Sequence, residues 1–158
     1  MNHEHTDFDH VGKHIAEILA SSASREERAR AVAAEIHAAG NYRWVGLYDV
    51  TAEAVSIIGY SGPGAPSYPS FARDRGLTGE VLRTGQTVVV GDVTANAKYL
   101  TAFATTRSEM IVPVRADGEI AGTIDVESER VDALTGADRV ALERIAQALE
   151  PLFSEARR

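Results

Sequence analysis

Two alternating apolar segments joined by Asp117-Gly118 constrain the fold of this chain more than any other feature. Residues 108–116 read SEMIVPVRA and residues 119–128 read EIAGTIDVES, with apolar side chains recurring at every second position. A period of two is typical of strands with one buried face, and a short Asp-Gly connection is typical of a hairpin. The sequence therefore predicts an antiparallel β-hairpin over residues 108–128.

The register of this hairpin follows from the same alternation. A two-residue turn would mix core and polar positions on both faces, so we predict a three-residue turn over residues 116–118, with Gly118 in a left-handed conformation. Val114 then lies opposite Ile120 on a uniformly apolar face that packs into the core. Ala121 lies on the other face.

That other face carries three acids in the predicted register. Glu109 lies directly opposite Asp125, and Glu127 follows two residues along on the same side, together with Ile111 and Thr123. Like charges about 5 Å apart repel, so they need a cation between them or a proton on one carboxyl group. We interpret the cluster as a seat for an ammonium or another cationic group. On spacing alone, a solvent-exposed sheet face with acids for solubility is the favoured alternative, and loops folded over this face would favour the binding site.

The remaining segments predict one α+β domain over residues 1–158. Helices are expected within residues 1–40, with a capping box at Ser24, and over 135–158, with a second capping box at Thr135 and a weakened end at Pro151. Residues 41–134 hold the sheet and the pocket loops, with further strands at 44–50, 54–60 and 87–93. This order predicts a mostly antiparallel sheet of five to six strands. The terminal helices pack on one face, and loops 61–75 and 94–107 cover a pocket on the other.

Composition narrows the possible functions. The chain has 158 residues, a formal net charge of −7 and no cysteine. An acidic chain without clustered Lys and Arg is a poor partner for nucleic acid or an anionic membrane, and no apolar stretch approaches the roughly 20 residues that span a bilayer. The N-terminus lacks the features of a secretion signal, so we expect a cytoplasmic location. The absence of cysteine excludes disulfides and thiolate nucleophiles.

Four blocks of sequence occur in order: WVGLYDV, RGLTG followed by GQTVVVGDV, RSEMIVPV and GTIDVES. Over about residues 40–150 they resemble the GAF domain family, and within it the chain is most similar to free methionine-R-sulfoxide reductases. The resemblance implies a pocket over the sheet in which cysteines reduce the oxidised free amino acid. It places those cysteines at Thr78, at Ala102 and near Tyr68, where this chain has none.

The acids of that pattern are largely kept, with Glu127 where aspartate is usual, and the resemblance implies that they hold the substrate. Sulfoxide reduction needs an attacking thiolate and a second thiol, which threonine and alanine cannot replace. We therefore predict a small-molecule-binding sensory or regulatory domain with no reductase activity. Two alternatives stay open: a dimerisation or scaffolding module without a ligand, and an enzyme with altered, non-thiol chemistry in the same pocket.

The predicted ligand is a small molecule such as an amino acid or another amine-bearing compound. Arg73, Arg75 and Arg107 are candidates to clamp a ligand carboxylate. We predict no catalytic residue, no cofactor and no metal, because the pair His10 and His14 lacks an evident third ligand. The resemblance also implies a homodimer formed through the terminal helices. The predicted ligand-binding residues are Glu109, Asp125, Glu127, Thr78, Trp44, Tyr68, Phe71, Ala102, Ile111 and Thr123.

Overall fold

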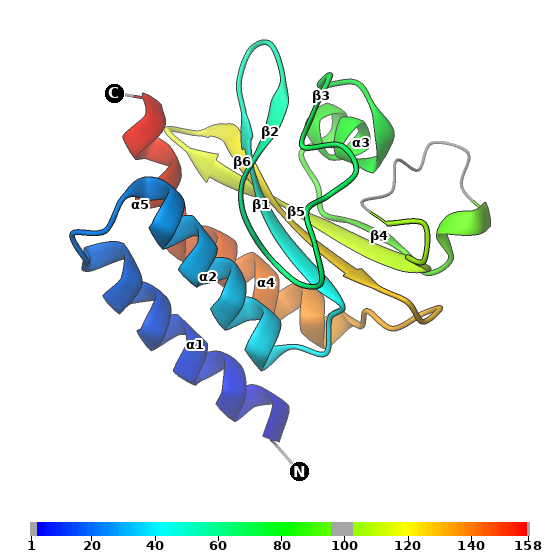
Figure 1. Cartoon of the computed structure of the whole chain (residues 1–158), viewed down its shortest axis with the longest axis horizontal. Coiled ribbons are helices and arrows are strands. Elements are labelled where there is room, and N and C mark those ends of the chain that lie inside the picture. Colours follow the sequence, from blue (N-terminus) through cyan, green and yellow to red (C-terminus); the bar gives the residue numbers. More distant parts are fainter. Residues whose placement is uncertain (1–2, 96–102, 158) are drawn as a thin grey trace.

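The computed structural model describes residues 3–95 and 103–157 and arranges them around one antiparallel sheet (Figure 1). Its strands are β1 (Trp44–Val50), β2 (Val55–Ser61), β3 (Ser70–Phe71), β4 (Val88–Val90), β5 (Ser108–Ala116) and β6 (Glu119–Ser128). They lie side by side in the order β3-β2-β1-β6-β5-β4. The sheet and its helices confirm the predicted α+β class and the predicted number of strands.

Helices cover the two faces of the sheet unequally (Figure 1). One face carries α1 (His3–Ala20), α2 (Arg25–Ala39), α4 (Gly136–Ala148) and α5 (Glu150–Ser154), whereas α3 (Gly76–Thr84) packs on the other. Short 3₁₀ helices span Val93–Ala95 and Glu155–Arg157. The C-terminal helix is interrupted at Leu149, two residues before Pro151, as the missing amide hydrogen of proline predicts. In the described residues, no helix combines the length and apolar composition needed to cross a bilayer.

The main core lies between the sheet and the four helices. It takes alternate residues from the central strands, such as Val45, Leu47, Met110, Val112 and Ile124, all of which are buried. Alternation along each strand sends the intervening residues to the opposite face, beneath α3 and the connections. The acids predicted to cluster belong to that opposite face.

The β5–β6 hairpin corrects the predicted register. Its turn has two residues, Asp117 and Gly118, both with positive φ (55° and 80°), as the tight hairpin turn that suits strand twist requires. A β-bulge then follows in β6, because Val114 pairs with Gly122 and Arg115 pairs with Ile120. The expected pairing of Val114 with Ile120 is therefore wrong.

The bulge explains why faces could be predicted while partners could not. One extra residue restores the alternation that the two-residue turn would otherwise invert. Ala121, predicted beside the acids, packs instead in the main core, and Ile120 packs with the aromatic residues of the opposite face. Glu109 lies opposite Glu127, and Ile111 lies opposite Asp125, so the predicted Glu109–Asp125 pair is also wrong. The three acids nevertheless share one face.

Helices α2 and α4 are capped at the predicted residues, although at Ser24 the described structure shows one of the two hydrogen bonds of the predicted capping box. Ser24 accepts a hydrogen bond from the Glu27 amide, and Thr135 forms a full capping box with Asp138 at the start of α4. In this box the Asp138 Oδ2 atom also accepts from the Thr135 amide at 2.8 Å.

We expect Thr135→Ala to lower the free energy of unfolding by about 1 kcal/mol, the usual effect of losing an N-cap side chain. Urea denaturation followed by circular dichroism measures the change. Thr135→Ser keeps the hydroxyl and should remain close to the wild type. An alanine variant as stable as the wild type would show that this cap does not support α4.

Candidate ligand-binding site

Three buried carboxyl groups meet on the sheet face that lies opposite the four helices. Glu109 of β5 and Asp125 and Glu127 of β6 are 2%, 8% and 1% exposed. One oxygen from each lies within 4.8 Å of the others. This burial argues against the solvent-exposed acidic face that spacing alone favoured, and the structure brings the three predicted acids together.

Burial controls the protonation of the cluster. Removal from water raises the pKa of Asp125 well above its ordinary value, and the charge of Glu127 and a hydrogen bond between the two carboxyl groups raise it further. Thr106 Oγ1 donates to Glu127 Oε1 at 2.7 Å. The Asp125 carboxyl group therefore holds a proton more readily than an exposed aspartate does.

Two buried polar atoms beside the cluster lack a hydrogen-bond partner among the residues that the structure describes. They are Asp125 Oδ1 and Thr123 Oγ1, and both residues lie on the same strand and face. A buried polar atom without a partner costs roughly 1–3 kcal/mol, so such atoms are rare in folded proteins. They mark a place where a hydrogen-bonding group from outside the described chain would be stabilising.

An aromatic wall stands beside the acids. Trp44 is fully buried, pairs across the strands with Glu127, and donates from Nε1 to the Gly64 carbonyl at 3.1 Å. Its indole lies over Gly46, where a Cβ atom would sit 2.2 Å from the ring. Glycine at position 46 therefore allows the indole to lie flat against the sheet, next to Asp125 on the neighbouring strand.

Further aromatic rings extend this wall. Tyr60 stacks on Trp44 with 6.2 Å between ring centroids, and Phe103 meets the indole edge-on at 5.8 Å. Tyr48 packs against Phe71 at 5.8 Å. Burial raises the pKa of the Tyr48 phenol, and the charges of the three acids raise it further, so this hydroxyl group stays protonated near the cluster.

Helix α3 covers the same face with the segment that holds Thr78. Leu77 and Val81 pack on Ile111, which lies directly opposite Asp125. Thr78 lies between Leu77 and Val81 in the sequence, and it is buried, with 6% of its surface exposed. The helix begins at Gly76, whose positive φ of 62° turns the chain at the first residue of the helix. Thr78 thus brings a hydroxyl group where the resemblance implies a thiol.

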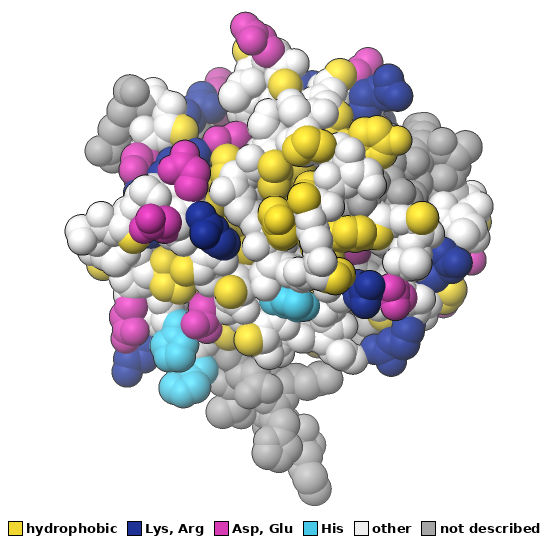
Figure 2. Space-filling view, viewed as in Figure 1, with side chains coloured by type: hydrophobic (Ala, Val, Ile, Leu, Met, Phe, Trp, Pro, Cys, Tyr) yellow, Lys and Arg dark blue, Asp and Glu magenta, His cyan; other side chains and the backbone are white. Residues whose placement is uncertain are grey.

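The other predicted site residues lie as follows. Tyr68 is 47% exposed. Figure 2 shows apolar side chains gathered on this view of the surface, over the region where Figure 1 places β2, β3 and α3. Ala102 lies outside the described residues. Arg73 and Arg107 donate to the backbone carbonyls of Thr51 and Thr106, respectively.

Two residues near the acids were missed as site residues. Thr106 precedes β5 with no pattern that singles it out, and only the fold reveals its bond to Glu127. Tyr48 is not among the predicted ligand-binding residues, although its alternation with Trp44 along β1 places both rings on the acidic face. The period-two pattern was the signal available for Tyr48.

The three carboxyl groups could also hold a metal ion, since oxygen-only ligands suit Mg²⁺ or Ca²⁺.

Two histidines of α1 were the other candidate metal ligands in the sequence. His10 stacks on His14, and His14 Nδ1 lies 3.2 Å from Glu35 Oε2. The Nδ1 atom of His14 therefore already contacts a carboxylate of α2.

Comparison with known proteins finds one matching family and a relative that aligns over most of the chain. The GAF domain family profile matches residues 22–152. Protein YtsP of Bacillus subtilis is 26% identical over 127 residues, which cover 80% of this chain and 78% of YtsP.

Solved structures give the same fold. A free methionine-R-sulfoxide reductase from Neisseria meningitidis, solved with its substrate, superposes with a TM-score of 0.84 and 29% identity, covering 95% of this chain and 90% of the reductase. A putative GAF sensor protein from Burkholderia vietnamiensis gives a TM-score of 0.85 at 23% identity, covering 98% and 99% of the two chains. The latter likeness concerns the fold alone.

Proposed function

The chain belongs to the GAF domain family, whose members are commonly ligand-binding sensory or regulatory modules, and from this premise we propose that it binds an amine-bearing small molecule. The amine lies at the cluster formed by Glu109, Asp125 and Glu127, against the indole of Trp44. Binding to this site, rather than reduction of the ligand, is the proposed activity.

The observation that carries this proposal is a pair of buried atoms, Asp125 Oδ1 and Thr123 Oγ1, that have no hydrogen-bond partner within residues 3–95 and 103–157 and lie next to three carboxyl groups. An ammonium group offers three N–H donors and one positive charge, so it can satisfy both atoms and compensate the acids at once. A quaternary ammonium carries the charge without donors and leaves both atoms unsatisfied. A free or singly substituted amine is therefore the favoured ligand.

The neighbouring face of Trp44 suits the same ligand. An aromatic ring attracts a cation placed over it, and tryptophan does so most strongly among the aromatic residues. The structural relative from Neisseria meningitidis is a reductase of a free amino acid, which supports a ligand of similar size. This chain has no cysteine, so the thiol chemistry of such reductases has no nucleophile here.

The protein's single tryptophan makes the proposal directly testable. Because Trp44 adjoins the acids, its fluorescence should change when an amine binds. Free amino acids, methionine sulfoxide and simple alkylamines are titrated against their N-acetylated forms, which lack the positive charge. We expect saturable changes with at least one amine and none with its acetylated form.

Substitution at the cluster provides the matched variants. Removing a charge-assisted hydrogen bond in Asp125→Asn or Glu109→Gln should weaken amine binding about 10- to 100-fold. Glu129→Gln removes an exposed acid near the end of the same strand and should leave affinity unchanged. If no amine in the panel binds, or if Glu129→Gln weakens binding as much as Asp125→Asn, the proposal is wrong.

Three broader predictions remain part of this proposal. They are a single domain over residues 1–158, a cytoplasmic location and a homodimer. Sedimentation velocity on the full chain tests the homodimer, for which twice the monomer mass is expected.

A further inference from the structure

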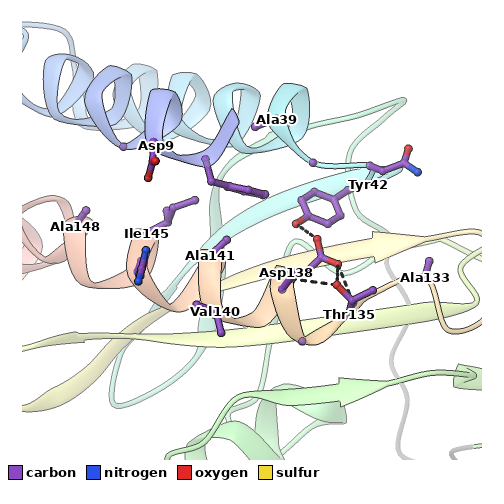
Figure 3. Close-up of a pocket in the computed structure, with 17 residues that line it drawn as sticks. Asp9, Ala39, Tyr42, Ala133, Thr135, Asp138, Val140, Ala141, Ile145 and Ala148 are labelled. Atoms are coloured by element: carbon purple, nitrogen blue, oxygen red, sulfur yellow. Dashed lines mark hydrogen bonds between the residues drawn. The ribbon is translucent and has the colours of Figure 1, made fainter. Parts of the chain in front are cut away.

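A groove of about 820 Å³ lies between α1 and α4, on the helical side of the sheet and away from the acids (Figure 3). Its floor is apolar and includes the side chains of Phe8, Ala141, Ile145 and Ala148. Pockets for small organic molecules usually measure about 300–1,000 Å³ and combine an apolar lining with a few polar groups. The groove is therefore large enough for a ligand of its own.

Gly12 leaves one wall of this groove open. It occupies the middle of α1, where glycine is disfavoured because it loses more backbone entropy than alanine. Close packing does not require it, since a Cβ atom at position 12 would have no atom within 4 Å. The glycine thus has no packing role there, and any larger side chain would extend into the groove.

Unengaged groups of opposite charge flank the apolar floor. Asp9 lies on α1 and Arg144 on α4, and Figure 3 shows Asp9 pointing from α1 across the groove toward Ile145 of α4. Neither Asp9 nor Arg144 forms an ion pair or hydrogen bond with any residue that the structure describes, and the same holds for the side chain of Asn41.

Asp138 is different, because its carboxylate already accepts hydrogen bonds from Tyr42 and Thr135 (Figure 3). Among the described residues that line it, the groove therefore offers Asp9 as a free anion, Arg144 as a free cation and Asn41 as a free amide around an apolar surface.

We propose that this groove binds a short apolar peptide of two or three residues as a zwitterion. Asp9 pairs with the peptide's amino terminus, and Arg144 holds its carboxylate, which a guanidinium group can bind through two parallel hydrogen bonds. The apolar side chains lie on the floor, and Asn41 hydrogen-bonds the peptide backbone. A single amino acid would fill only a small part of the groove, whereas a ligand with one charge would leave Asp9 or Arg144 without a partner.

Calorimetric titration of the full chain with the tripeptide Leu-Ala-Leu tests this proposal. Its N-acetylated form lacks the positive charge, and its C-terminal amide lacks the negative one. We expect saturable binding of the free tripeptide and at least tenfold weaker binding of each blocked form. Equal binding of the three peptides, or no binding of the free tripeptide, would overturn the proposal.

The Gly12→Leu variant tests whether peptide binding is lost because the groove is filled or because the fold is damaged. The leucine should raise the melting temperature, because it replaces a mid-helix glycine and meets no clash, while it abolishes peptide binding. Ala16→Leu adds the same side chain one turn along α1, outside the groove, and should retain binding. Peptide binding that survives Gly12→Leu would contradict the assignment. A second outcome would also contradict it. If the protein binds no peptide and Gly12→Leu changes its sedimenting mass, the groove is an interface between copies of the chain.

This site and the acidic cluster can fail independently. Asp125→Asn should leave peptide binding unchanged, and Gly12→Leu should leave the amine-dependent change in Trp44 fluorescence unchanged. If Asp125→Asn removes peptide binding, the tripeptide binds at the acids and the groove is not its site.

Discussion

Replacing Trp44 with alanine is expected to lower the free energy of unfolding by about 3–5 kcal/mol, the range for truncating a large, fully buried aromatic side chain. The loss has three sources in this structure. The indole leaves a cavity over Gly46, Tyr60 and Phe103 lose their ring contacts, and the Gly64 carbonyl loses its donor. Urea denaturation followed by circular dichroism measures the change, since the variant has no tryptophan left to fluoresce.

Two further variants test whether this loss of stability is specific to Trp44 or follows the truncation of any aromatic side chain. Trp44→Phe keeps much of the apolar volume but loses the Nε1 donor, so it should be considerably less destabilising than alanine. Tyr68→Ala, at a side chain that is nearly half exposed, should stay within about 0.5 kcal/mol of the wild type. A Trp44→Ala variant as stable as Tyr68→Ala would mean that the indole does not fill the space over Gly46.

The faces of the central strands could be predicted because alternation is a local property. Residues such as Met110 and Ile124 face the helices, and Glu109, Asp125 and Glu127 face the other side, as the period of two requires. The helix caps at Ser24 and Thr135 could be predicted for the same reason, since a cap depends on residues within one turn. These features need no knowledge of distant contacts.

Pairing across strands could not be predicted in the same way. A bulge at Ala121 combines a preferred two-residue turn with the correct faces, and the choice between that solution and a longer turn depends on how the hairpin packs. The burial of the acids also depends on distant segments, because α3 and the aromatic residues of β1 cover them. The groove beside Gly12 was missed altogether, since a glycine within a helical pattern gives no indication of which helix lies opposite.

Protonation of Asp125 leads to the second large effect, a dependence of stability on pH that Asp125→Asn should remove. The folded state raises the pKa of this carboxyl group through burial, the charge of Glu127 and their shared hydrogen bond. The folded protein therefore holds a proton that the unfolded chain releases above about pH 3.9. Stability from this group is fully present below that pH and is lost as the pH rises through the folded-state pKa.

The asparagine variant cannot ionise, so its stability should lack this part of the pH dependence. We expect it to be more stable than the wild type at pH 8 by roughly 1–3 kcal/mol, and we expect the difference to shrink as the pH falls toward 4. Urea denaturation across this range measures both proteins, and Glu129→Gln, at an exposed position, should parallel the wild type throughout. A constant difference between Asp125→Asn and the wild type would show that Asp125 titrates alike in the folded and unfolded states. In that case the cluster would carry its full negative charge at neutral pH even without a ligand, and an amine would bind without displacing a proton.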